Sequence, residues 1–165
     1  MKTPRVGMES RRHTPTFDSG PGDAYRLDRK LADPATCPKC KATYRAGRWT
    51  WEKAPPQAAP AECPACRRIA DDYPGGWLTL KGAFFAEHRT QVLARVIARE
   101  THEKAEHPLQ RIIAFDERGP AETVVTTTDP HLARNIAEAL EAAFKGKVAL
   151  DFSPGENRVR ATWER

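Results

Sequence analysis

Two short stretches, Cys37-Pro38-Lys39-Cys40 and Cys63-Pro64-Ala65-Cys66, decide how the first half of this 165-residue chain folds. They contain all four cysteines, and 22 residues separate the two pairs. Each C-x-x-C turn can direct two thiolates at one cation, and two such turns complete a tetrahedral site of four sulfurs. The sequence therefore predicts a four-cysteine zinc ribbon over residues 34–73, in which Cys37, Cys40, Cys63 and Cys66 bind a structural Zn²⁺ ion.

Other uses of four cysteines fit the pattern less well. Four thiolates can also hold iron, as in rubredoxins, so iron is the alternative metal. Disulfides need an oxidising compartment, and the polar N-terminus does not have the apolar core of a secretory leader. No apolar run approaches the roughly 20 residues that span a bilayer. We therefore expect a cytoplasmic protein with no membrane partner.

The positive charge is concentrated near the metal ligands. The chain has a net charge of +5, and residues 77–165 contribute none of it, since they hold 13 Lys/Arg and 13 Asp/Glu. Residues 34–76 hold 7 Lys/Arg against 4 Asp/Glu, and residues 1–33, which we expect to form a disordered basic tail, hold 7 against 5. A localised basic excess favours an anionic partner, and nucleic acid is the commonest. Solubility alone is the competing interpretation.

Basic and aromatic residues are interleaved after the first cysteine pair, over residues 44–53, and two arginines, Arg67 and Arg68, directly follow the second pair. Such residues can pair with phosphates and stack on bases. They can equally offset the charge of the thiolates or pack over the metal, an interpretation that suits the tryptophans best. As a single ribbon strand, residues 44–53 place Trp49 and Trp51 on one face. The candidate RNA contacts are Arg45, Arg48, Trp49, Lys53, Arg67 and Arg68.

Residues 77–165 alternate between strand-like and helix-like periodicity. We expect strands at 77–85, 109–115, 122–128, 148–152 and 159–163, with helices at 87–103 and 130–145. Asp129-Pro130 is typical of a helix start, because Asp caps and Pro suits the first turn. Gly75-Gly76 is expected to be a hinge between the two parts. The order predicts a ferredoxin-like βαββαβ domain with one further strand, and an α+β class for the whole chain.

Catalytic signatures are missing from the sequence. None of the five histidines belongs to a recognisable catalytic motif, and the chain has no phosphate-binding glycine loop or nucleophile elbow. We expect a protein that is not an enzyme and that has no small-molecule substrate.

Two regions resemble a known family. Cys37-x-x-Cys40-x(8)-Trp49, followed by Cys63-x-x-Cys66-Arg67 and by residues 73–80, is similar to the zinc-bearing N-terminal part of the nonsense-mediated mRNA decay protein three family. Residues 133–148 and the closing stretch 158–163 are also similar to that family. The chain looks like a compact bacterial relative. It departs from the family in two respects, because the further cysteine pairs and the longer C-terminal domains that the family usually has are absent from this sequence.

The resemblance implies a zinc module, with the four cysteines as ligands, beside an α+β domain that contacts ribosomal RNA or protein. The resulting hypothesis is a non-enzymatic zinc-binding protein that associates with RNA on a ribosomal particle. The alternatives are a protein–protein adaptor with a purely structural zinc and a rubredoxin-like iron electron carrier.

Overall fold

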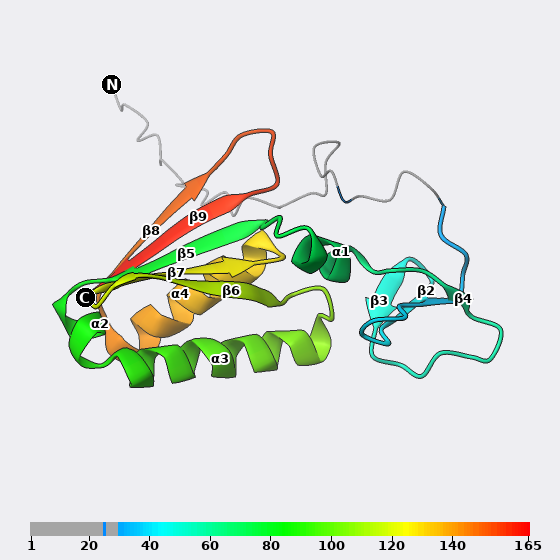
Figure 1. Ribbon diagram of the computed structural model, residues 1–165, viewed down its shortest axis with the longest axis horizontal. Coiled ribbons are helices and arrows are strands. Elements are labelled where there is room, and N and C mark those ends of the chain that lie inside the picture. Colours follow the sequence, from blue (N-terminus) through cyan, green and yellow to red (C-terminus); the bar gives the residue numbers. More distant parts are fainter. Residues whose placement is uncertain (1–24, 26–29) are drawn as a thin grey trace, which may run out of the picture.

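The computed structural model describes Tyr25 and residues 30–165. The tail expected over residues 1–33 therefore lies almost entirely outside the described residues. The described chain is mixed α+β, with a small sheet at one end, a larger sheet at the other and a short helix between them (Figure 1). No helix in the described part of the chain is long and apolar enough to cross a membrane.

Residues 34–73 are built from short strands and one helix, and we call them the metal-binding module after the ion that their four cysteines are predicted to hold. Its sheet has the order β3-β2-β1-β4, in which β1 pairs antiparallel with β2 and parallel with β4. At the tip of the β2–β3 hairpin, Ala46 and Gly47 both take left-handed φ values, 49° and 81°, and reverse the chain. Residues 44–53 therefore do not form the single ribbon strand on which Trp49 and Trp51 would share a face, and Trp51 lies beyond the hairpin. The elements are β1 (Ala35–Thr36), β2 (Thr43–Arg45), β3 (Arg48–Thr50), β4 (Ala59–Pro60) and α1 (Pro64–Ala70).

The larger domain follows the expected succession of strands and helices, with one additional short helix. The strands are β5 (Gly76–Lys81), β6 (Ile112–Gly119), β7 (Glu122–Thr127), β8 (Lys147–Phe152) and β9 (Val159–Glu164). The helices are α2 (Ala83–Glu87), α3 (Arg89–Glu106) and α4 (Pro130–Phe144). Asp129 caps α4 as expected, since its Oδ1 accepts a hydrogen bond of 2.8 Å from the His131 N–H.

The strand order of the larger sheet is β6-β7-β5-β9-β8. In the sequence β5-α3-β6, the two strands are parallel and β7 lies between them, which is a split βαβ unit. The last strand, β9, does not extend the sheet at its edge. It enters between β5 and β8 and runs parallel to β5. Its alternate residues Val159, Ala161 and Trp163 are fully or almost fully buried, which explains why β9 is central and the half-buried β8 is at the edge.

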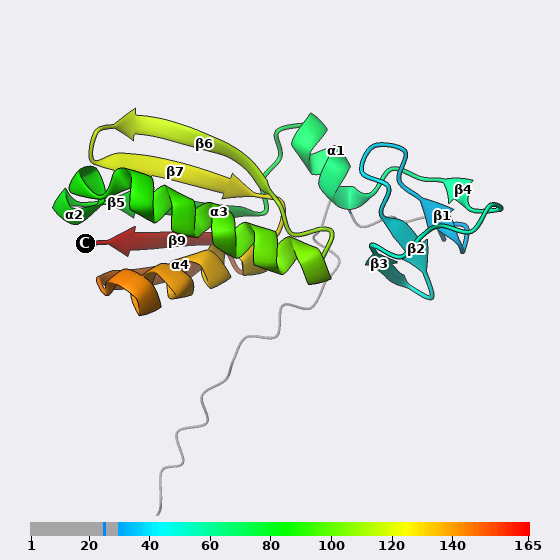
Figure 2. The same ribbon diagram turned by 90° about the horizontal axis from the view of Figure 1, so that it is seen from below.

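One face of this sheet is covered by α3 and α4 (Figure 2). The core between them is formed by large apolar side chains, chiefly Leu78, Leu80, Phe85, Ile136, Leu140 and Trp163. This apolar layer holds α3 and α4 against the sheet.

Three expected elements in this domain have wrong bounds. The first strand ends at Lys81, because Gly82 has φ 111° and residues 83–87 form α2, so Phe85 reaches the core from a helix. The long helix spans 89–106 instead of 87–103. The next strand spans 112–119 instead of 109–115, and residues 107–111 instead form a loop that contacts the first module.

The expected hinge is closely packed. A Cβ added at Gly76 would lie 2.8 Å from the Ala133 Cβ, and one added at Gly75 would lie 2.8 Å from the Thr128 carbonyl oxygen. Glycine at both positions lets β5 start directly against the beginning of α4.

Candidate metal centre

The four cysteine sulfurs converge, although they come from two distant parts of the chain. All four lie within 4.8 Å of one another, and Cys40 Sγ is 3.7 Å from Cys63 Sγ. A tetrahedral ion with metal–sulfur bonds of about 2.3 Å separates its sulfurs by about 3.8 Å. The cluster therefore has the donor set and the spacing to hold one metal ion.

The first cysteine pair is held by the turn between β1 and β2. The Cys37 N–H donates to the Ala42 carbonyl oxygen at 2.8 Å, and the Lys41 N–H donates to the Cys37 carbonyl oxygen at 2.9 Å. Lys41 takes a left-handed φ of 67°, which closes the loop around Cys40. This arrangement is the ribbon-type turn that the C-x-x-C spacing predicts.

The second pair occupies the start of a helix. Cys63 is the N-cap of α1, Pro64 stands in the first helical turn, and the Cys66 N–H donates to Cys63 Sγ at 3.4 Å. The Cys63 N–H in turn donates to Cys37 Sγ at 3.4 Å. The site is thus ribbon-like in its two C-x-x-C turns, but a helix supplies the second turn because N–H groups at a helix start favour thiolates.

The surroundings of the cysteines affect their ionisation in different directions. Burial opposes ionisation of Cys37, but N–H groups of Cys40, Cys63 and Lys39 and the Cys40 thiol outweigh it, so the pKa of Cys37 falls to about 6. Burial raises the pKa of Cys63 and that of Cys66, and the nearby Cys40 charge adds to the rise at Cys63. Cys63 and Cys66 therefore need a cation to become thiolates at neutral pH.

Arg111 of the larger domain reaches the sulfurs. It is 9% exposed, and its two terminal nitrogens lie 3.3 Å from Cys66 Sγ and 3.7 Å from Cys63 Sγ. Burial opposes the charge of this guanidinium, but the hydrogen bonds and charges of the cysteines raise the pKa of Arg111 above its usual value. Arg111 therefore stays cationic beside the cluster.

Apolar groups close the remaining sides. The buried part of the cluster consists of Cys37, Cys63, Ala65 and Cys66, and Cys40, Trp49 and Leu109 pack against it. The Trp49 ring lies 5.5 Å from that of Tyr44 on the neighbouring strand. Trp49 therefore serves as cover for the metal centre in this structure.

The basic candidates divide into surface residues and one buried residue. Arg45, Arg48, Lys53 and Arg67 are exposed. Arg68 is only 7% exposed, donates to the Tyr73 carbonyl oxygen and stacks on the ring of Tyr25 at 4.6 Å. Arg68 thus packs inside the junction between the two parts and is poorly placed for an external phosphate.

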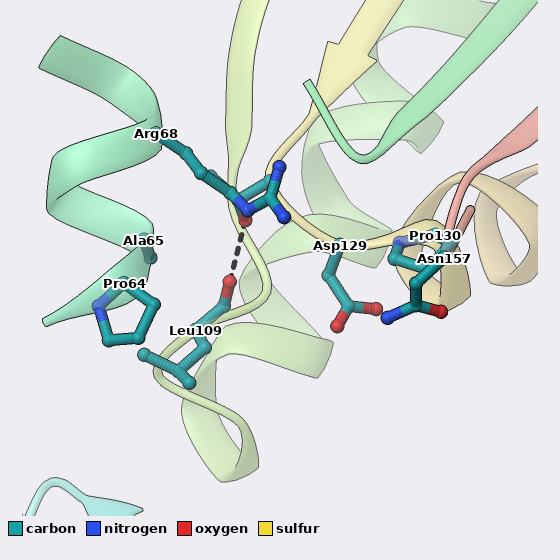
Figure 3. A pocket seen from close by; sticks show the side chains of 8 residues that line it. Pro64, Ala65, Arg68, Leu109, Asp129, Pro130 and Asn157 are labelled. Atoms are coloured by element: carbon teal, nitrogen blue, oxygen red, sulfur yellow. Dashed lines mark hydrogen bonds between the residues drawn. The ribbon is translucent and has the colours of Figure 1, made fainter. Parts of the chain in front are cut away.

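A small cavity with a lining that is half polar and half apolar adjoins Arg68 (Figure 3). It lies between α1 and the start of α4, has a volume of about 70 Å³, and is lined in part by Arg68, Leu109, Asp129 and Asn157. Among the described residues, the buried Asn157 Oδ1 has no hydrogen-bond partner. The polar part of the lining and the small size suit ordered water.

Sequence reasoning did not single out Arg111. A signal was present, because Arg111 stands in an alternating stretch with Leu109 and Ile113, where one face is otherwise apolar. A charge on an apolar face indicates a buried ion that needs a counter-ion. What the sequence does not reveal is that the counter-ion lies more than 40 positions away, at Cys63 and Cys66.

Comparisons with protein families, with curated proteins and with solved structures find no match to this chain. The fold and the site therefore define a class only: an α+β protein with a four-cysteine cluster positioned to hold a metal ion.

Proposed function

We propose that this chain is a non-enzymatic zinc-binding protein that associates with RNA through its metal-binding module. The observation that carries the proposal is the tip of the β2–β3 hairpin. Arg45 and Arg48 are directly opposite each other across the two strands, and both are exposed. Like charges in that position cost stability. Neither side chain makes an ion pair or a hydrogen bond with another described residue, so the pair favours an external anion.

Zinc is the metal that suits this cluster best. Four thiolates in a partly buried, closed set of donors are typical of structural Zn²⁺ sites, which leave no open position for a substrate. The experiment is elemental analysis of freshly purified protein together with its visible spectrum. One zinc per chain and a colourless solution support the proposal. A red protein with iron supports the electron carrier instead, because ferric tetrathiolates absorb visible light.

The RNA contact is tested by its salt dependence. Each phosphate neutralised on a single strand contributes about −0.7 to the slope of log K against log salt concentration. Replacing Arg45 and Arg48 by Ala should therefore weaken binding of a single-stranded RNA and reduce that slope by about 1.4. The matched control is Arg95→Ala with Lys147→Ala, which removes two exposed cations from the larger domain. Equal slopes for the two double variants would contradict a contact through the hairpin.

A ribosomal particle is the RNA partner that the resemblance implies. We propose it on that ground and on the basic excess of residues 1–76. The chain should sediment with ribosomal subunits at low salt and dissociate as salt is raised. Sedimentation that shows neither ribosomes nor other RNA with the protein would refute the association.

A protein–protein adaptor is the second candidate, favoured by apolar side chains on the neutral domain. Ile97 on α3 is 50% exposed, and Phe115 on the edge strand β6 is 39% exposed. In that case a partner protein recovered with the wild type should also be recovered with the Arg45→Ala, Arg48→Ala variant. Its loss in that variant would count against the adaptor.

A further inference from the structure

A buried guanidinium from the larger domain is aimed at the metal centre. This residue is Arg111, and two hydrogen bonds within the larger domain fix its position. Its Nε donates to the Pro108 carbonyl oxygen at 2.7 Å, and its backbone N–H donates to Thr128 Oγ1 at 2.9 Å. The terminal nitrogens then reach across to Cys66 Sγ and Cys63 Sγ. Arg111 therefore bridges the two parts of the molecule through sulfur atoms.

The charge of Arg111 has no carboxylate partner within residues 30–165. A buried cation is strongly unfavourable without an anion beside it. Four thiolates around a divalent ion carry a net charge of about −2, which supplies that anion. The position of Arg111 is thus explained by a metal-loaded cluster and is costly beside the neutral thiols of Cys66 and Cys63, which its two terminal nitrogens contact.

Two further contacts shield this bridge from water. The Trp51 ring lies 5.7 Å from the Arg111 guanidinium carbon, and its indole N–H donates to the Lys104 carbonyl oxygen near the end of α3. Leu109, two residues before Arg111, packs against the cysteine cluster. The loop of residues 107–111 therefore contacts the metal-binding module in three ways. Arg111 hydrogen-bonds to sulfur and lies over the Trp51 ring, and Leu109 packs against the cysteines.

We propose that Arg111 is an outer-sphere partner of the metal centre, which positions Cys63 and Cys66 for the ion and fastens the larger domain to the metal–thiolate charge. The inference rests on the metal site proposed above. N–H···S bonds orient the sulfurs and withdraw electron density from them, and such supporting residues commonly change metal affinity 10–100-fold when they are replaced. Arg111 is a positioning residue, since it touches the ligands and not the ion.

The first test uses full-length protein loaded with Co²⁺, whose sulfur-to-metal charge-transfer band reports on the thiolates. Arg111→Met should move this band to longer wavelength, because the sulfurs regain electron density, and should speed metal transfer to a chromogenic chelator about 10–100-fold. Arg111→Lys should lie between Arg111→Met and the wild type in both the band position and the transfer rate, since lysine keeps the positive charge but not the two forked N–H donors. The control is Arg95→Met, an exposed arginine on α3, which should behave as wild type.

The second test needs no variant. Hydrogen exchange of the wild type is compared before and after removal of the metal by a chelator, and the amides of residues 107–112 should exchange faster in the metal-free protein. Unchanged exchange in that loop overturns the inference. The Co²⁺ experiment overturns it as well if Arg111→Met keeps the wild-type far-ultraviolet circular dichroism and also shows the wild-type charge-transfer band and metal-transfer rate. A wild type that takes up neither cobalt nor zinc refutes the metal site itself, which is a distinguishable outcome.

Discussion

The cysteine thiols of the candidate metal centre differ in pKa, and this difference should appear in the pH dependence of the affinity for a metal ion. Cys37, with a pKa of about 6, is already ionised in the metal-free protein at neutral pH. Cys63 and Cys66 have raised pKa values and lose their protons only when the ion binds. Affinity should therefore rise with pH above 7, because the protons of Cys63 and Cys66 are displaced by the ion.

Below pH 6 one more proton must be displaced, from Cys37. A plot of log affinity for Zn²⁺ against pH should become steeper by about one unit as the pH falls through 6. Competition titrations against a chelator of known affinity, at pH values from 5 to 8, measure this slope. A slope that stays constant across pH 6 would show that Cys37 is not the acidic thiol of the set.

Asp129 has two opposing effects on stability. Its side chain caps the start of α4, which stabilises the helix, but burial disfavours its ionised carboxylate. Its replacement by Ala removes the hydrogen bond to the His131 N–H and should lower the free energy of unfolding by about 0.5–2 kcal/mol. Asn keeps the cap. Burial raises the pKa of Asp129 above its value in the unfolded chain, so the ionised carboxylate costs stability at neutral pH.

That cost disappears as the pH falls below the unfolded pKa of Asp, because the carboxyl is then protonated in both states. Asp129→Asn should therefore gain most over the wild type at pH 7, and its advantage should shrink as the pH falls towards 4. Urea denaturation at several pH values, read by far-ultraviolet circular dichroism, tests the sign. An advantage that grows on acidification would mean that the charge stabilises the fold.

At the level of elements, the sequence predicts what depends on local chemistry. The cap at Asp129-Pro130 and the two C-x-x-C turns are of this kind. The position of β9 depends on competition between strands for the centre of the sheet, which no local pattern encodes. The turn of the chain after Gly82 and the reach of Arg111 to Cys66 likewise depend on distant partners.

The first residue of β5, Gly76, packs so closely against α4 that a larger side chain would not fit. A methyl group at Gly76 would meet the Ala133 Cβ at 2.8 Å and Thr127 Oγ1 at 2.5 Å. Gly76→Ala should lower the free energy of unfolding by about 1–3 kcal/mol through overpacking. Because one of the two clashes is with Ala133, adding Ala133→Gly should cost less in the Gly76→Ala background than in the wild type. Strict additivity in this double-mutant cycle, measured by urea denaturation, would argue that the two residues are not in contact.

We expect the two parts of the whole molecule to depend on a bound metal ion to different degrees. The metal-binding module has strands of two or three residues, and its buried cluster consists of three cysteines and Ala65. Such a segment has little apolar surface to offset the entropy of ordering its chain, so we expect a bound ion to supply the difference. The larger domain instead has its own core around Phe85, Leu140 and Trp163.

Metal removal should therefore unfold one part and leave the other. After chelation, backbone amides of residues 35–50 should lose their protection from hydrogen exchange, and amides of β5, β7 and β9 should keep theirs. A Cys37→Ser, Cys40→Ser variant should show the same pattern without a chelator, which controls for side effects of the reagent. Loss of protection throughout β5, β7 and β9 would instead mean that the core layer of the larger domain is not stable alone. The chain would then fold as one cooperative unit, with the metal contributing to the stability of every strand.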